Sequence, residues 1–188
     1  MGLFFSSVDW RDQYAKHHSD QVTILCTELA QQINLRADET RILQLSATLH
    51  DIGKLAISEA VVGKASRLTQ AEILMIQQHP IFGYKLIKPL NMEPMLAAAI
   101  LSHHENYDGS GYPEGLRGEQ IPFAARLIRI TDFYDSLTTN RSYRAGYDPN
   151  QALEILRQNR HCFDPGLFDA FVNLMTQKIQ TDQGDPKP

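Results

Sequence analysis

The sequence is poor in cysteine, with only Cys26 and Cys162 among 188 residues. The two thiols lie far apart in apolar stretches, and they are too few for a zinc–thiolate site or a disulfide framework. We therefore expect both to be reduced thiols in or near the core.

Long apolar runs and an excess of positive charge are also missing. No stretch approaches the ~18 apolar residues of a membrane span, and residues 1–7 lack the basic segment and cleavage site of a signal peptide. The net charge of -4 argues against general binding to DNA or RNA. We expect a cytoplasmic protein that binds neither membrane nor nucleic acid. A phosphate-ester substrate would need local attraction from bound cations or from placed arginine and lysine side chains.

What the chain does contain is helical periodicity. Apolar residues recur at spacings of three and four from Val22 to Ile33, and His18 lies on the same stripe, so we expect it to point inward. No run with a period of two indicates a strand. A chain of this length and of 43% hydrophobic content suits one substantial core. We predict an all-α, single-domain helical bundle over residues 8–180, with residues 1–7 and 181–188 peripheral or poorly ordered.

Capping signals place several helix ends. Asp38 is expected to cap a helix that ends near Gly53 with a left-handed turn. Thr69 and Glu72 form a capping box. Further predictions are a new start at His79-Pro80, a helix from Glu93 to His103-His104, a loop over 105–121, a helix over 122–137, and N-caps at Asp148-Pro149 and Asp164-Pro165.

Histidine and aspartate gather at these predicted helix ends. Taken singly, each is more often a structural or surface residue. Their joint occurrence favours a metal site inside the bundle, because His50-Asp51 and His103-His104 end helices and Asp132 interrupts an otherwise small and apolar stripe. A buried carboxylate needs a cation or strong donors. Imidazole and carboxylate without thiolate favour iron or manganese, with zinc or nickel also compatible.

The order of motifs resembles the HD-GYP family of cyclic di-GMP phosphodiesterases, a branch of the HD metal-dependent phosphohydrolase superfamily. The resemblance runs from about Asp12 to Phe171. It rests on Arg11-Asp12-Gln13-Tyr14 before His18, His50-Asp51-Ile52-Gly53-Lys54, His79-Pro80, His103-His104-Glu105, Asp108-Gly109-Ser110-Gly111-Tyr112-Pro113, Asp132, Arg141-Ser142-Tyr143-Arg144 and Phe163-Asp164-Pro165.

The resemblance implies a ligand set for two divalent ions. One ion would be held by His18, His50, Asp51 and Asp132, and the other by His79, His103 and His104, with Asp51 bridging both. Iron or manganese is favoured, with zinc, nickel or magnesium as alternatives. Tyr14 stands where some members carry a glutamate for a third ion, so we expect two ions only.

The resemblance also implies the reaction. A hydroxide activated by the two ions would open cyclic di-GMP to pGpG, which would be cut onward to GMP. Asp51 and Lys54 would be catalytic, and Lys54, Tyr112, Arg141 and Arg144 would bind the substrate. The loop Gly111-Tyr112-Pro113 is implicated in contacts with GGDEF-domain proteins.

Two other functions stay open at this point. The chain could be a weakly catalytic receptor for cyclic di-GMP that docks a GGDEF partner. It could also be a phosphohydrolase acting on another cyclic dinucleotide or on a nucleotide. Among the other polar residues, His17 is expected to face solvent and His161 to be structural, while Arg126 and Arg129 lie at the surface or bridge the core.

Overall fold

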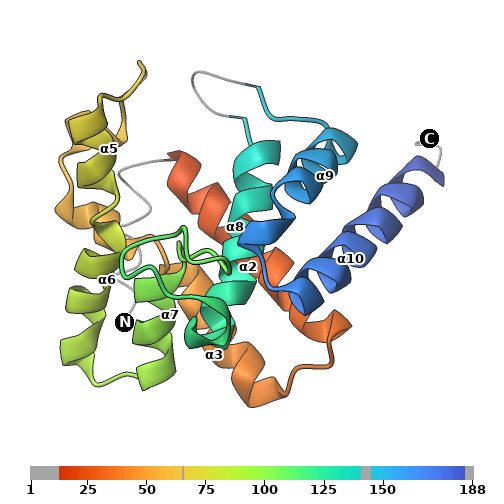
Figure 1. Cartoon of the computed structure of the whole chain (residues 1–188), viewed down its shortest axis with the longest axis horizontal. Coiled ribbons are helices and arrows are strands. Elements are labelled where there is room, and N and C mark those ends of the chain that lie inside the picture. The colour runs from red at the N-terminus through yellow and green to blue at the C-terminus, as the bar shows by residue number, and fades with distance from the viewer. Residues whose placement is uncertain (1–12, 65, 141–144, 185–188) are drawn as a thin grey trace.

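A computed structural model describes residues 13–64, 66–140 and 145–184, and every regular element in these ranges is helical (Figure 1). The α-helices are α2 (Gln13–Gln32), α3 (Ala37–Leu49), α4 (Glu59–Val62), α5 (Gln70–Ile76), α6 (His79–Ile87), α7 (Pro94–Ser102), α8 (Phe123–Thr138), α9 (Pro149–Gln158) and α10 (Pro165–Gly184). The 3-10 helices are η1 (Ile52–Ala56), η2 (Lys88–Leu90), η3 (Gly118–Gln120) and η4 (Arg160–Cys162). The all-α prediction is confirmed.

Helix α8 forms the centre of the larger core. Its side chains Ala125 and Ile128 are fully buried and pack with residues of α2, α3, α9 and α10, among them Phe171. A smaller core joins the end of α3, η1, α6 and α7 around Leu49 and Ile100. Figure 1 shows α6 and α7 on one flank, α9 and α10 on the other, and α2, α3 and α8 between them. Because α3 and α7 contribute to both cores, their ends lie where the cores meet.

Most of the predicted boundaries are confirmed. The capping box of Thr69 and Glu72 is present, Asp148 caps α9 with a capping box, and the Asp164 side chain accepts two N–H bonds at the start of α10. Residues 105–121 form a loop apart from η3. Helix α10 runs to Gly184, four residues past the expected end of order. The domain limits 8–180 stay a prediction.

The prediction for Asp38 is wrong. Helix α3 begins at Ala37, and the residue before it, Arg36, has an extended backbone. Asp38 lies inside the first turn, where its negative charge favours the positive end of the helix dipole.

The explanation given for Gly53 is also wrong. Helix α3 ends at Leu49, and His50 keeps right-handed backbone angles as the chain continues into η1. Gly53 has no positive φ, but a Cβ there would lie 1.8 Å from the His79 carbonyl oxygen and 2.5 Å from the Gly83 nitrogen. Glycine is needed because η1 and α6 touch backbone to backbone.

Both cysteines are free, with Cys26 buried and Cys162 half-buried, as expected. Among the described residues, no helix combines the length and apolar character needed to cross a bilayer.

Candidate metal centre

Three histidines are oriented by the helix ends on which they sit. His50 follows the last residue of α3, His79 opens α6, and His103 follows the last residue of α7. In each ring Nδ1 lies 2.7 Å from the carbonyl oxygen of the residue three positions earlier. A carbonyl can only accept, so Nδ1 donates and the lone pair of the neutral ring is at Nε2.

These Nε2 atoms lack a suitable partner within the described chain. His50 Nε2 is buried without a hydrogen-bond partner. His79 Nε2 and His103 Nε2 lie 3.1 Å apart, so two lone pairs face each other. Two acceptors cannot form a hydrogen bond with one another, and a buried acceptor without a hydrogen bond costs free energy. A cation could accept the lone pairs of all three nitrogen atoms. In this respect the candidate ligands fit a metal ion.

Asp51 lies in the middle of the cluster. Its Oδ1 is 3.2 Å from His79 Nε2, and its Oδ2 is 3.5 Å from His50 Nε2 and 3.9 Å from His18 Nε2. Two groups of close ligand atoms therefore share this carboxylate. The groups are Asp51, His79, His103 and His104, and His18, His50 and Asp51, with the ligand atoms of each group within 4.8 Å of one another.

Asp132 on α8 connects the two groups. Its Oδ1 lies 3.1 Å from His18 Nε2, and its Oδ2 lies 3.9 Å from His104 Nδ1. Asp132 is absent from the two tighter groups, but it contacts a member of each. The structure thus gathers all seven residues predicted as ligands, from α2, α8 and the ends of α3, α6 and α7.

Charge in the cluster is set by burial and by the neighbours. Burial lowers the pKa of the His103 and His104 rings well below 6.5 and also lowers the pKa of His50. Burial alone would raise the pKa of Asp51, but the positive charge of Lys54 is the largest opposing cause, and that pKa lies well below its usual range. Neutral imidazole and ionised carboxylate are the forms that bind metal.

His18 is the exception, and Asp135 is the reason. The ring Nδ1 lies 2.5 Å from Asp135 Oδ2 while Nε2 faces Asp132. Burial lowers the pKa of His18, but the bonds to the two carboxylates outweigh it and raise that pKa to about 10. Sequence reasoning missed Asp135, although its position three residues after Asp132 puts both on one face of α8.

Metal binding should therefore depend on pH through His18. The metal-free ring is protonated below about pH 10, and an ion must displace that proton. We expect the affinity for Mn²⁺ to rise about tenfold per pH unit from pH 7 to 9, as loss of one proton requires. This window lies above the pH 5–8 range that unperturbed histidines would give. Competition with a chelator at pH 7, 8 and 9 measures the slope.

The matched variant for that measurement is Asp135→Asn. It removes one of the two carboxylates that hydrogen-bond the His18 ring and raise its pKa, so the slope should become shallower. A flat slope in the wild type, or an equal slope in the variant, would contradict the role given to His18.

The structure describes two of the four residues expected to bind substrate. Lys54 Nζ lies 2.5 Å from Asp51 Oδ2, with a third of the side chain exposed. The Tyr112 ring stacks on His104, with centroids 4.9 Å apart and planes at 26°. Arg141 and Arg144 lie outside the described residues, as does Asp12.

The loop that carries Tyr112 is organised by a carboxylate whose role the sequence did not reveal. Glu105 is 1% exposed and accepts backbone N–H bonds from Glu114, Gly115 and Leu116 at 2.7–3.1 Å. Three donors from one turn onto one buried carboxylate hold the loop against α7.

Arg126 and Arg129, whose roles the sequence left open, each connect separate parts of the fold. Arg126 on α8 pairs with Asp164 at 2.5 Å, and Arg129 donates to Asn106 Oδ1 at 2.8 Å. His17 is exposed, as expected.

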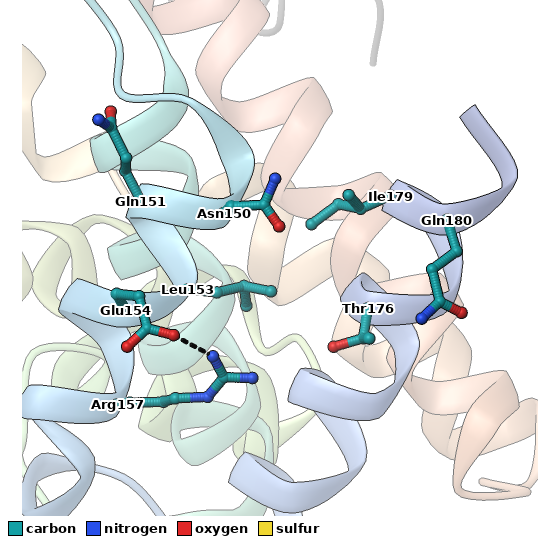
Figure 2. Close-up of a pocket in the computed structure, with 8 residues that line it drawn as sticks. All are labelled: Asn150, Gln151, Leu153, Glu154, Arg157, Thr176, Ile179 and Gln180. Carbon is teal, nitrogen blue, oxygen red and sulfur yellow. Dashed lines mark hydrogen bonds and ion pairs between the residues drawn. The ribbon is translucent and has the colours of Figure 1, made fainter. Parts of the chain in front are cut away.

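A pocket lies elsewhere, between α9 and α10 (Figure 2). Its lining includes amides, Thr176 and the ion pair of Glu154 with Arg157, and it contains none of the seven candidate ligands. Five of the seven candidate ligands are instead buried in the interior, and the other two are half-buried beside them.

Comparison with known proteins gives consistent results. A family model described as HD domain matches residues 6–167. The chain is 35% identical over 177 residues to the cyclic di-GMP phosphodiesterase response regulator RpfG of Xanthomonas campestris pv. campestris, covering 93% of this chain and 47% of that protein. It is 36% identical over 174 residues to 3'3'-cGAMP-specific phosphodiesterase 3 of Vibrio cholerae, covering 92% and 38%.

A solved structure supports the fold. The chain superposes on Bd1817, a HDG"Y"P protein from Bdellovibrio bacteriovorus, with a TM-score of 0.73 at 21% identity, covering 90% of this chain and 53% of that one. The chain spans less than half the length of the two curated relatives.

Proposed function

This chain belongs to the HD domain family, and we propose that it is a metal-dependent phosphodiesterase that hydrolyses cyclic di-GMP to pGpG and onward to GMP. The observation that carries the proposal is the carboxylate of Asp51, which is shared by two groups of histidines whose ring nitrogens converge on it. A relative that covers most of this chain is named for the same activity.

The candidate ligands would be divided between two divalent ions. Asp51 would bridge them, with His18, His50 and Asp132 on one ion and His79, His103 and His104 on the other. Such a pair supplies positive charge to the phosphoryl oxygens and acidifies a water molecule. Iron or manganese suits this set of imidazoles and carboxylates, and zinc, nickel or magnesium are the alternatives.

The other site residues would bind and orient the dinucleotide. Lys54 supplies a fixed positive charge beside Asp51. The face of Tyr112 that does not stack on His104 could receive a base. Arg141 and Arg144 would pair with phosphate oxygens through their forked donors. The loop Gly111-Tyr112-Pro113 would also be the contact for a GGDEF-domain partner.

Lys54→Ala tests the first of these roles. We expect both ions to stay bound and kcat to fall about 100-fold, the scale on which one placed charge at a reacting group acts. The matched control is Lys64→Ala, which removes a similarly exposed lysine paired with Glu72. Metal analysis and steady-state kinetics on both variants give the answer. Normal turnover in Lys54→Ala would remove this side chain from the chemistry.

The activity itself is tested with protein purified without oxygen and loaded with Fe²⁺ or Mn²⁺. Elemental analysis should find two ions per chain, and chromatography should show cyclic di-GMP converted to pGpG and then GMP. A chelated sample is the control. No turnover by fully loaded protein would end the proposal, and tight binding without hydrolysis would favour the receptor.

A second substrate has a specific observation in its favour. The relative named for 3'3'-cGAMP is as similar to this chain as the relative named for cyclic di-GMP, at 36% and 35% identity. Comparing kcat/KM for cyclic di-GMP, 3'3'-cGAMP and cyclic di-AMP therefore decides the substrate, and we expect cyclic di-GMP to be preferred.

A further inference from the structure

A second cluster of possible ligands lies outside the metal centre. Asp108 comes from the loop that carries Tyr112, and His161 and Cys162 come from η4. One ligand atom from each of the three residues lies within 4.8 Å of the other two. We propose that Asp108, His161 and Cys162 form a separate site for a divalent cation of the zinc class, with solvent completing the coordination. This site is independent of the proposed hydrolysis.

Hydrogen bonds fix the backbone on both sides of the cluster. The Tyr107 N–H donates to the Cys162 carbonyl oxygen at 2.9 Å, which ties the residue before Asp108 to η4. Asp108 Oδ1 accepts from the Ser110 N–H at 2.9 Å and from the Ser110 hydroxyl at 2.6 Å. These bonds occupy Oδ1, so Oδ2 is the oxygen that faces His161.

One distance in the cluster is already close to that between two ligands of one ion. Zinc bonds of about 2.0–2.3 Å in a tetrahedral site put neighbouring ligand atoms roughly 3.3–3.8 Å apart. His161 Nε2 and Asp108 Oδ2 lie 3.9 Å apart. His161 was expected to be structural, but 63% of its side chain is exposed, so it can turn without disturbing the core.

The chemistry of the three groups selects the class of ion. A thiolate with an imidazole and a carboxylate suits zinc or a similar borderline cation, and not magnesium or calcium. Arg129 is a nearby positive charge, and its guanidinium donates to Asn106 and lies 5.8 Å from the Phe163 ring centroid. Arg129 is therefore committed to other partners, and the Asp108 carboxylate offsets its charge.

Binding here would fasten the loop of Tyr112 to η4. Asp108 lies four residues before Tyr112, and Cys162 lies three residues before Pro165, the first residue of α10. An ion that joins them would restrain the loop from outside the metal centre.

The test uses the whole chain titrated with Co²⁺ alone, beyond the amount that fills the metal centre. The candidate ligands of that centre contain no sulfur. A sulfur-to-cobalt charge-transfer band in the near ultraviolet would therefore report a thiolate ligand outside it. We expect this band in the wild type, its loss in Cys162→Ser, and its retention in Cys26→Ala.

A second variant guards against misfolding of the first. His161→Ala removes an exposed side chain, so the fold should be unchanged. The affinity of this site for Co²⁺, followed by the band, should fall in this variant. The fall should exceed the roughly 10- to 100-fold that a metal site loses when a residue hydrogen-bonded to one of its ligands is removed. Zn²⁺ should also slow alkylation of Cys162. No band in the wild type, a band that survives Cys162→Ser, or unchanged affinity in His161→Ala would each overturn the proposal.

Discussion

Asp51→Asn is expected to lose both metal ions and, with them, hydrolysis by a factor of about 1000 or more. The factor follows because metal ions contribute several kcal/mol to transition-state stabilisation. The carboxylate belongs to both ligand groups, so one substitution weakens both sides of the centre. An amide keeps the volume of the side chain but removes the negative charge that faces His79, His50 and Lys54.

The fold should survive this change, which separates chemistry from stability. Lys54 would lose its partner, but a third of its side chain is exposed and can be hydrated. Elemental analysis and turnover on the variant are compared with Asp20→Asn, which changes an exposed aspartate on α2. If Asp51→Asn retained two ions, the bridging role would be wrong.

Gly53→Ala is expected to destabilise the chain by about 3 kcal/mol or more, at or beyond the upper end of what overpacking usually costs. The new Cβ would lie 1.8 Å from the His79 carbonyl oxygen, and backbone cannot move aside as a flexible side chain can. Helix α6 must shift, and His79 is its first residue. The variant should therefore also bind metal more weakly.

The matched substitution is Gly166→Ala in the first turn of α10. A Cβ there meets Asp164 Oδ1 at 3.5 Å, an ordinary contact. Its stability should stay within about 1 kcal/mol of the wild type, because alanine is the better helix former. Urea denaturation of both variants without metal gives the two free energies of unfolding. Equal values would show that η1 and α6 do not touch as described.

The residues that the sequence could place are those with a local signal. His18 follows from the stripe of α2, and the caps at Thr69, Asp148 and Asp164 follow from short-range chemistry. Asp132 could be placed inside because a carboxylate interrupts an apolar face of α8. The ligand set and its grouping came from the resemblance to a family, since residues from five helices carry no spacing rule.

What could not be predicted depends on contacts between distant segments. Gly53 looked like a helix end because its neighbour across the fold, α6, is invisible in the local pattern. Asp135 looked like any polar residue of α8 until His18, 117 residues earlier, was placed beside it. Glu105 likewise gained its role only when the loop folded back onto its carboxylate.

The three rings held by carbonyl oxygens at helix ends have a consequence for how the centre is filled. Their aim is set by the main chain and needs no ion to establish it. Lys54 meanwhile offers Asp51 a tethered countercharge. The backbone can thus hold the three rings in position before any ion binds, so metal loading can follow folding.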